Sequence, residues 1–190
     1  DYVTMAGDLK ALLDHLDLQE VTLVGFSMGG GEIAKYFSQY AGERVSKVVM
    51  VSTVAPYLLK TADTPEGVPR EGIDGILTAL ANDRPSFLEG FNKNFYGVSL
   101  LKHPVSDVFL NVATNKAMDA SPIATIECAK AFSFTDFRDD MKSINVPTLV
   151  IHGDADAIVP IKATGDLAAK MIPGAKYIMY EGAPHGLWFT

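Results

Sequence analysis

The chain has 190 residues, 48% of them hydrophobic, which is enough for one domain over residues 1–190 with a sizeable core. Its formal net charge of -7 argues against nucleic acid or an anionic membrane as a partner, because both favour basic surfaces. The single cysteine, Cys128, excludes an internal disulfide, and no segment has the length and apolar character of a membrane span. We therefore expect a cytoplasmic protein, and leave open whether it forms a homo-oligomer.

The expected elements alternate between helices and strands along much of the chain. Apolar residues recur at helical spacing from Met5 to Leu16, which predicts an amphipathic first helix. Further elements are expected at 21–24 (strand), 32–40 (helix), 47–51 (strand), 148–151 (strand), 163–171 (helix) and 176–180 (strand). This alternation predicts an α/β fold with a mostly parallel sheet and helices on both of its faces.

The alternation stops between about residues 57 and 134, where no buried strand pattern occurs. Pro85, Pro104 and Pro122 each suit the first turn of a helix. We interpret this stretch as a helical cap inserted between two strands. Within it Phe87, Phe91 and Phe95 recur every four residues and share one helix face, as core residues commonly do and as the wall of an apolar pocket also would.

The most informative motif is Gly25-Phe-Ser27-Met-Gly29, which lies between an expected strand and an expected helix. A serine on such a sharp turn takes a strained backbone, and glycines two residues away on either side would let helix and strand pack closely. The pattern alone also fits a glycine-rich turn with a solvated serine. The strand before it, the helix after it, and a later acid and histidine favour a nucleophile elbow with Ser27 as nucleophile.

Two carboxylates compete for the role of the acid. Asp154 and Asp156 follow the strand at 148–151 in an acidic loop. Asp156 is farther beyond the strand end and better placed to reach a histidine, so we assign it that role, and we expect Asp154 to hold the loop through backbone N–H groups. The pair could also suggest a metal site, but the regularly spaced oxygen ligands of a calcium loop are missing, so we expect no metal.

Of the four histidines, only His185 follows the last expected strand, in Ala183-Pro-His-Gly186. His15 lies on the first helix, His103 precedes a proline, and His152 ends a strand, all positions typical of surface or structural residues. The required order of serine, acid and histidine therefore selects His185 as the general base.

These motifs, together with Thr135-Asp-Phe-Arg138 and His152-Gly-Asp-Ala-Asp-Ala-Ile-Val-Pro160, resemble the α/β-hydrolase fold family, and within it the cofactor-free chloroperoxidase and aryl esterase branch. The resemblance implies hydrolysis of small carboxylic esters, perhydrolysis with hydrogen peroxide, and no haem, metal or other cofactor. It also implies strands before Asp1 that carry a second oxyanion donor, and a helix after Thr190, so we expect the chain to be part of a larger domain.

The expected reaction is acyl transfer, in which the Met28 N–H binds the developing oxyanion. We expect an apolar substrate pocket lined by Phe26, Phe87, Phe91, Phe95, Ile158 and Val159. The alternative is a hydrolase-like binding protein that keeps the pocket without turnover, and an esterase assay would distinguish the two.

Overall fold

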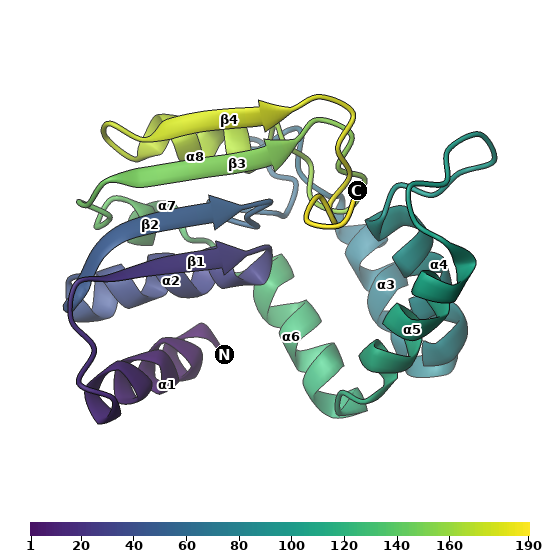
Figure 1. Cartoon of the computed structure of the whole chain (residues 1–190), viewed down its shortest axis with the longest axis horizontal. Coiled ribbons are helices and arrows are strands. Elements are labelled where there is room, and N and C mark those ends of the chain that lie inside the picture. The colour runs from purple at the N-terminus through teal and green to yellow at the C-terminus, as the bar shows by residue number, and fades with distance from the viewer.

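A four-stranded parallel sheet forms the centre of the computed structural model, which describes residues 1–190 (Figure 1). Its strands follow one another in chain order: β1 (Val21–Phe26), β2 (Val45–Val51), β3 (Thr148–Gly153) and β4 (Lys176–Tyr180). Every neighbouring pair is parallel. The carboxyl ends of all strands therefore meet at one edge of the sheet, where ligands bind in open α/β folds.

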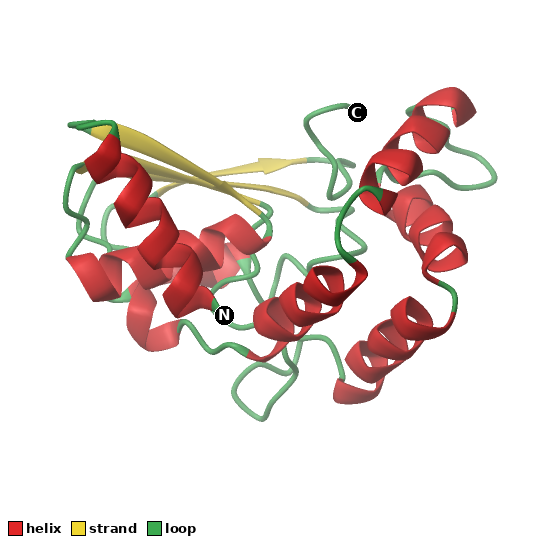
Figure 2. Cartoon of the chain, turned by 90° about the horizontal axis from the view of Figure 1, so that it is seen from below, coloured by secondary structure: helices red, strands yellow, loops and turns green.

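Four helices pack on one face of the sheet (Figure 2): α1 (Tyr2–His15), α2 (Met28–Tyr40), α7 (Arg138–Met141) and α8 (Gly165–Met171). Their apolar residues form one core with inward-facing strand residues such as Met50 and Val150, both fully buried. On the opposite face the residues Val24 and Ile178 are 57% and 42% exposed. The expected second layer of helices is thus not seen within residues 1–190.

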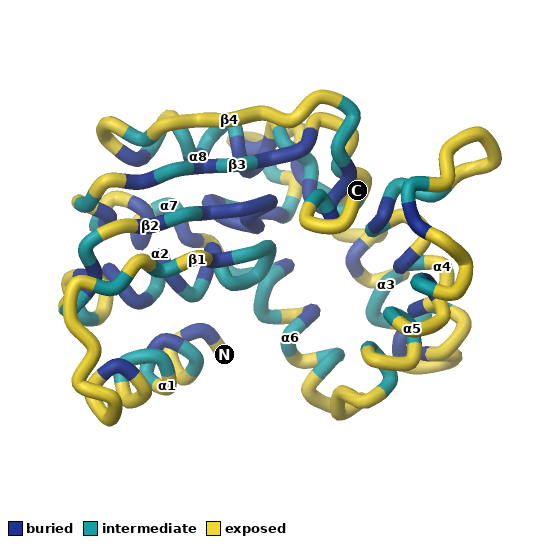
Figure 3. The backbone as a smooth tube through the Cα atoms, in the orientation of Figure 1, coloured by how far each residue is buried: buried dark blue, intermediate teal, exposed yellow.

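The central strands β2 and β3 are the most buried, whereas every residue of β4 is exposed (Figure 3). β1 forms the other edge of the sheet, and only Gly25 within it is buried. None of the helices is long and apolar enough to cross a bilayer.

Of the five helices between β2 and β3, all except α7 lie beyond the carboxyl edge of the sheet (Figure 1): α3 (Arg70–Asn82), α4 (Arg84–Phe95), α5 (Asp107–Met118) and α6 (Pro122–Phe134). Pro85 and Pro122 lie in first helical turns, as predicted. The prediction for Pro104 was wrong. α5 begins only at Asp107, because the Ser106 hydroxyl accepts the Phe109 N–H at 3.2 Å and so caps the helix there.

Candidate active site

Ser27 lies on the bend between β1 and α2, in a strained backbone conformation. Its φ of 52° and ψ of -115° are unfavourable for a residue with a Cβ. Three backbone hydrogen bonds hold this conformation: the Ser27 N–H donates to the Val51 carbonyl at 2.8 Å, and the Ser27 carbonyl accepts the Gly30 N–H at 3.1 Å and the Val54 N–H at 3.2 Å. Met28 is the first residue of α2, so its N–H has no acceptor within the helix.

The glycines around Ser27 differ in their packing. A Cβ built on Gly25 would lie 2.6 Å from the Gly29 carbonyl oxygen, which confirms that close packing of helix and strand requires glycine at position 25. The same expectation was wrong for Gly29, because a Cβ there would meet nothing within 4 Å. Instead the next two residues are tightly packed: a Cβ built on Gly30 would clash with Thr53 Oγ1, and one built on Gly31 would clash with Phe137 Cζ.

His185 and Asp156 form a buried hydrogen-bonded pair. His185 lies in the loop after β4, Asp156 lies in the loop after β3, and their side chains are 1% and 0% exposed. The His185 Nδ1–H donates to Asp156 Oδ2 at 2.7 Å, because an ionised carboxylate can only accept. In neutral His185 this leaves Nε2 without a proton, as a general base requires.

The Asp156 carboxylate has donors on both oxygens. Oδ1 accepts the Ile158 N–H at 2.9 Å and the Val159 N–H at 2.8 Å. Burial raises the pKa of the Asp156 carboxyl, but the hydrogen bonds from His152 and His185 and from the Val159 N–H outweigh burial and hold the pKa well below its usual range. Asp156 is therefore ionised at neutral pH.

Asp154 has the other position that we considered for the acid, and the structure gives it a different set of contacts. Asp154 is exposed, and its Oδ1 accepts the Gly182 N–H at 2.6 Å. This hydrogen bond joins the loop after β3 to the loop after β4. This agrees with the expectation that Asp154 holds the loop through a backbone N–H. No group of three or more histidine, cysteine or acidic side chains is close enough to share a metal ion.

Two of the other histidines, His15 and His103, are exposed. His152 is fully buried, and its Nε2 lies 3.1 Å from Asp156 Oδ2. Sequence reasoning gave His152 no part in the site. The two residues are four apart across the end of a strand, and such a spacing carries no signal of contact outside a helix.

Aromatic side chains surround His185. Its ring lies 5.0 Å from that of Phe26 and 4.9 Å from that of Phe95, measured between centroids. The Gly186 N–H also donates to the Phe95 carbonyl at 2.7 Å, so the carboxyl end of α4 is joined to the His185 loop. Ser27 directly follows Phe26, although its hydroxyl makes no hydrogen bond to His185 here; such bonds commonly tighten when substrate binds.

The remaining expected pocket residues lie at different depths. Phe91 pairs with Phe95 at 5.8 Å and Phe87 with Phe91 at 5.7 Å, and all three rings are half-buried, so this stripe is not part of the buried core. Ile158 packs against the main core, and Val159 belongs to it with 2% exposure.

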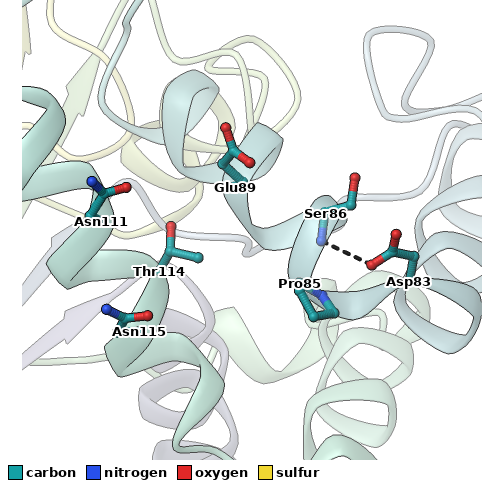
Figure 4. A pocket seen from close by; sticks show the side chains of 7 residues that line it. All are labelled: Asp83, Pro85, Ser86, Glu89, Asn111, Thr114 and Asn115. Atoms are coloured by element: carbon teal, nitrogen blue, oxygen red, sulfur yellow. Dashed lines mark hydrogen bonds between the residues drawn. The ribbon is translucent and has the colours of Figure 1, made fainter.

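A hollow of about 630 Å³ lies elsewhere, between α4 and α5 (Figure 4). It is lined by Asp83, Pro85, Ser86, Glu89, Asn111, Thr114 and Asn115. A second, of about 490 Å³, lies between α1 and α6. Neither hollow is lined by a histidine or by Ser27, so neither coincides with the pair of His185 and Asp156.

Comparison with known proteins settles the family. A family model described as alpha/beta hydrolase fold matches residues 1–190. The chain belongs to this family. Among α/β hydrolases of known structure, a bromoperoxidase from Bacillus anthracis is 46% identical with a TM-score of 0.95, over 98% of this chain and 68% of that one.

Two curated α/β-hydrolase relatives point to the same branch. A non-heme chloroperoxidase from Streptomyces lividans is 38% identical over 100% of this chain and 69% of its own length. A bifunctional esterase/perhydrolase from Acinetobacter calcoaceticus is 34% identical over 96% of this chain and 66% of its own length. The resemblance to the cofactor-free chloroperoxidase and esterase branch is thereby confirmed, and the chain spans about two thirds of the length of these relatives.

Proposed function

We propose that the chain carries the catalytic residues of a serine hydrolase that cleaves small carboxylic esters through an acyl-enzyme. The observation that carries this proposal is the buried pair of His185 and Asp156, with Nδ1 and Oδ2 2.7 Å apart, at the same sheet edge as Ser27. A buried, ionised carboxylate that fixes one histidine tautomer is what a serine nucleophile needs from its base.

In the proposed first step, the Ser27 hydroxyl attacks the ester carbonyl carbon while His185 Nε2 takes its proton. Asp156 stabilises the resulting imidazolium, and the Met28 N–H at the start of α2 donates to the oxyanion. The carbon–oxygen bond to the alcohol then breaks, and His185 returns the proton to the leaving alcohol. This sequence leaves the acyl group on Ser27.

In the second step, water attacks the acyl-enzyme with His185 again as base, and the carboxylic acid leaves. Hydrogen peroxide in place of water would release a peracid, which can oxidise a halide ion to the hypohalous acid and return to the carboxylic acid. The name of the Acinetobacter relative, bifunctional esterase/perhydrolase, supports this second acceptor. Neither acceptor requires a redox cofactor.

The surroundings of His185 favour apolar acyl or aryl groups. Phe26 and Phe95 flank its ring, and Phe91 and Phe87 continue the aromatic stripe along α4. We propose that Phe26 and Phe95 contact the substrate and that the other two rings bound longer groups. Ile158 and Val159 contribute through their N–H groups, which bind Asp156.

The test is hydrolysis of p-nitrophenyl acetate by the full-length protein. Ser27→Ala should lower turnover by up to about a millionfold, because loss of a triad serine removes the nucleophile. Ser86→Ala is the matched control, since Ser86 is exposed on α4 and should leave turnover unchanged. A wild-type protein that binds esters but does not turn them over would instead support a non-catalytic binding protein.

A further inference from the structure

His152 is a buried polar side chain that the proposed reaction does not use. Its side chain is 0% exposed, and Nε2 lies 3.1 Å from both Asp156 Oδ2 and the Val159 carbonyl oxygen. The other ring nitrogen, Nδ1, is buried with no hydrogen-bond partner. A buried nitrogen without a hydrogen-bond partner destabilises the fold, so a histidine at position 152 requires an explanation other than stability.

The neighbours of Nε2 fix its protonation. A carboxylate oxygen and a carbonyl oxygen are both acceptors, so Nε2 carries a proton and donates it between them. The packing at Nδ1 is equally specific, because a Cβ built on Gly165 at the start of α8 would lie 2.5 Å from Nδ1. Glycine at position 165 therefore gives the imidazole the space it occupies beside Asp156.

His152 completes the set of donors around the acid. The two backbone N–H groups hold Oδ1, whereas Oδ2 receives the Nδ1–H of His185 and the Nε2–H of His152. With only His185 on Oδ2, the carboxylate could follow that ring when it moves. The His152 N–H fixes Oδ2 from a second direction and favours the ionised form.

We propose that His152 is a positioning residue, which fixes the Asp156 carboxylate so that His185 stays in its reactive tautomer and orientation. This inference rests on the proposed function, because it needs Asp156 and His185 to act on Ser27. His152 itself touches neither the nucleophile nor the substrate in this account.

The experiment compares two substitutions in the full-length protein. His152→Leu removes the donor and keeps an apolar side chain of similar size, whereas His152→Gln places an amide N–H where Nε2 was. A serine-directed phosphonate counts the active sites, so kcat is expressed per titrated site and misfolded protein does not contribute. Thermal unfolding of each variant is recorded alongside.

H152L should lower kcat by about 10- to 100-fold, the effect of losing a hydrogen bond to a charged group, with KM unchanged. H152Q should recover most of that loss even where its melting temperature is no higher than that of H152L. A purely structural role would lower the melting temperature and the number of titrated sites but leave kcat per site at the wild-type value, and that result would overturn the proposal.

Two further variants cover the cases in which H152L does not fold or the proposed function itself is wrong. If H152L does not fold, His152→Met provides the same comparison, and equal losses of kcat in H152M and H152Q would refute the proposal. Ser27→Ala is measured in the same series. Activity retained in S27A would reject the proposed function itself, whereas loss in S27A with wild-type kcat in H152L would reject only the role of His152.

Discussion

Replacing Asp156 by asparagine exchanges one carboxylate oxygen for an NH₂ group, and the hydrogen bonds of the side chain determine which oxygen is exchanged. Oδ1 accepts two backbone N–H groups, from Ile158 and Val159. The asparagine carbonyl must stay there, because turning the amide over would set its NH₂ against both donors. The NH₂ group then takes the place of Oδ2, where it faces Nδ1 of His185. It also faces the Nε2–H of His152, which loses its carboxylate acceptor but keeps the Val159 carbonyl.

An NH₂ group at that place reverses the histidine tautomer. Nδ1 of His185 must now accept, so the proton moves to Nε2, which can no longer take the proton of Ser27. Loss of turnover by this route is about ten-thousandfold, equal to about 5 kcal/mol of transition-state stabilisation. The Asp156→Asn variant should still fold, because both backbone hydrogen bonds to the side chain remain.

The assay is steady-state hydrolysis of p-nitrophenyl acetate, with Asp154→Asn as the matched control. Asp154 is exposed and uses one oxygen, which accepts the Gly182 N–H, and asparagine keeps that acceptor. D154N should therefore change the free energy of unfolding by about 0.5 kcal/mol or less and leave kcat near the wild-type value. A D156N variant with more than about a tenth of wild-type turnover would refute the tautomer argument. A D154N variant that loses more turnover than D156N would refute it as well.

Three further predictions follow from the packing and charge of the site. Gly25→Ala should destabilise the protein by about 1–3 kcal/mol in chemical denaturation and lower turnover, whereas Gly29→Ala should do neither, and equal effects would contradict the packing at the elbow. Phe95→Ala should raise KM for phenyl acetate more than for ethyl acetate, and Phe87→Ala, two rings away from His185, should raise it less; a reversed order would move the pocket. Folding lowers the pKa of Asp156, so ionisation of this carboxyl stabilises the protein; that stabilisation should be complete above about pH 5 and decline below about pH 4. The difference in unfolding free energy between wild type and D156N should therefore shrink on acidification. A difference that stays constant with pH would contradict the lowered pKa.

The main features of the site were predictable because they depend on topology. A parallel sheet brings the residues after its strands to one edge, so the order of Ser27, Asp156 and His185 along the chain was enough to predict that all three lie at that edge. That Asp156 rather than Asp154 bonds His185 was predictable from the distance of each residue from the strand end. Chain order and strand boundaries are properties that the sequence carries directly.

Other features depend on which side of a turn meets its neighbours, and the sequence does not carry that information. The symmetric spacing of Gly25 and Gly29 about the serine suggested equal roles, yet only Gly25 faces packed atoms. The stripe of Phe87, Phe91 and Phe95 has the spacing of a core helix face, but its rings are half-buried because α4 lies beyond the sheet edge. The contact between His152 and Asp156 was not predicted because the two residues are joined by an irregular loop, in which sequence spacing does not indicate contact.

The most direct test of the account is to identify the residue that becomes covalently modified. The full-length protein is treated with diisopropyl fluorophosphate, and intact mass and peptide mapping are followed together with esterase activity. We predict one adduct per chain, on the hydroxyl of Ser27, formed at the rate at which activity is lost. An adduct on another residue that abolishes activity, or loss of activity while Ser27 stays unmodified, would contradict the assignment of Ser27 as the nucleophile.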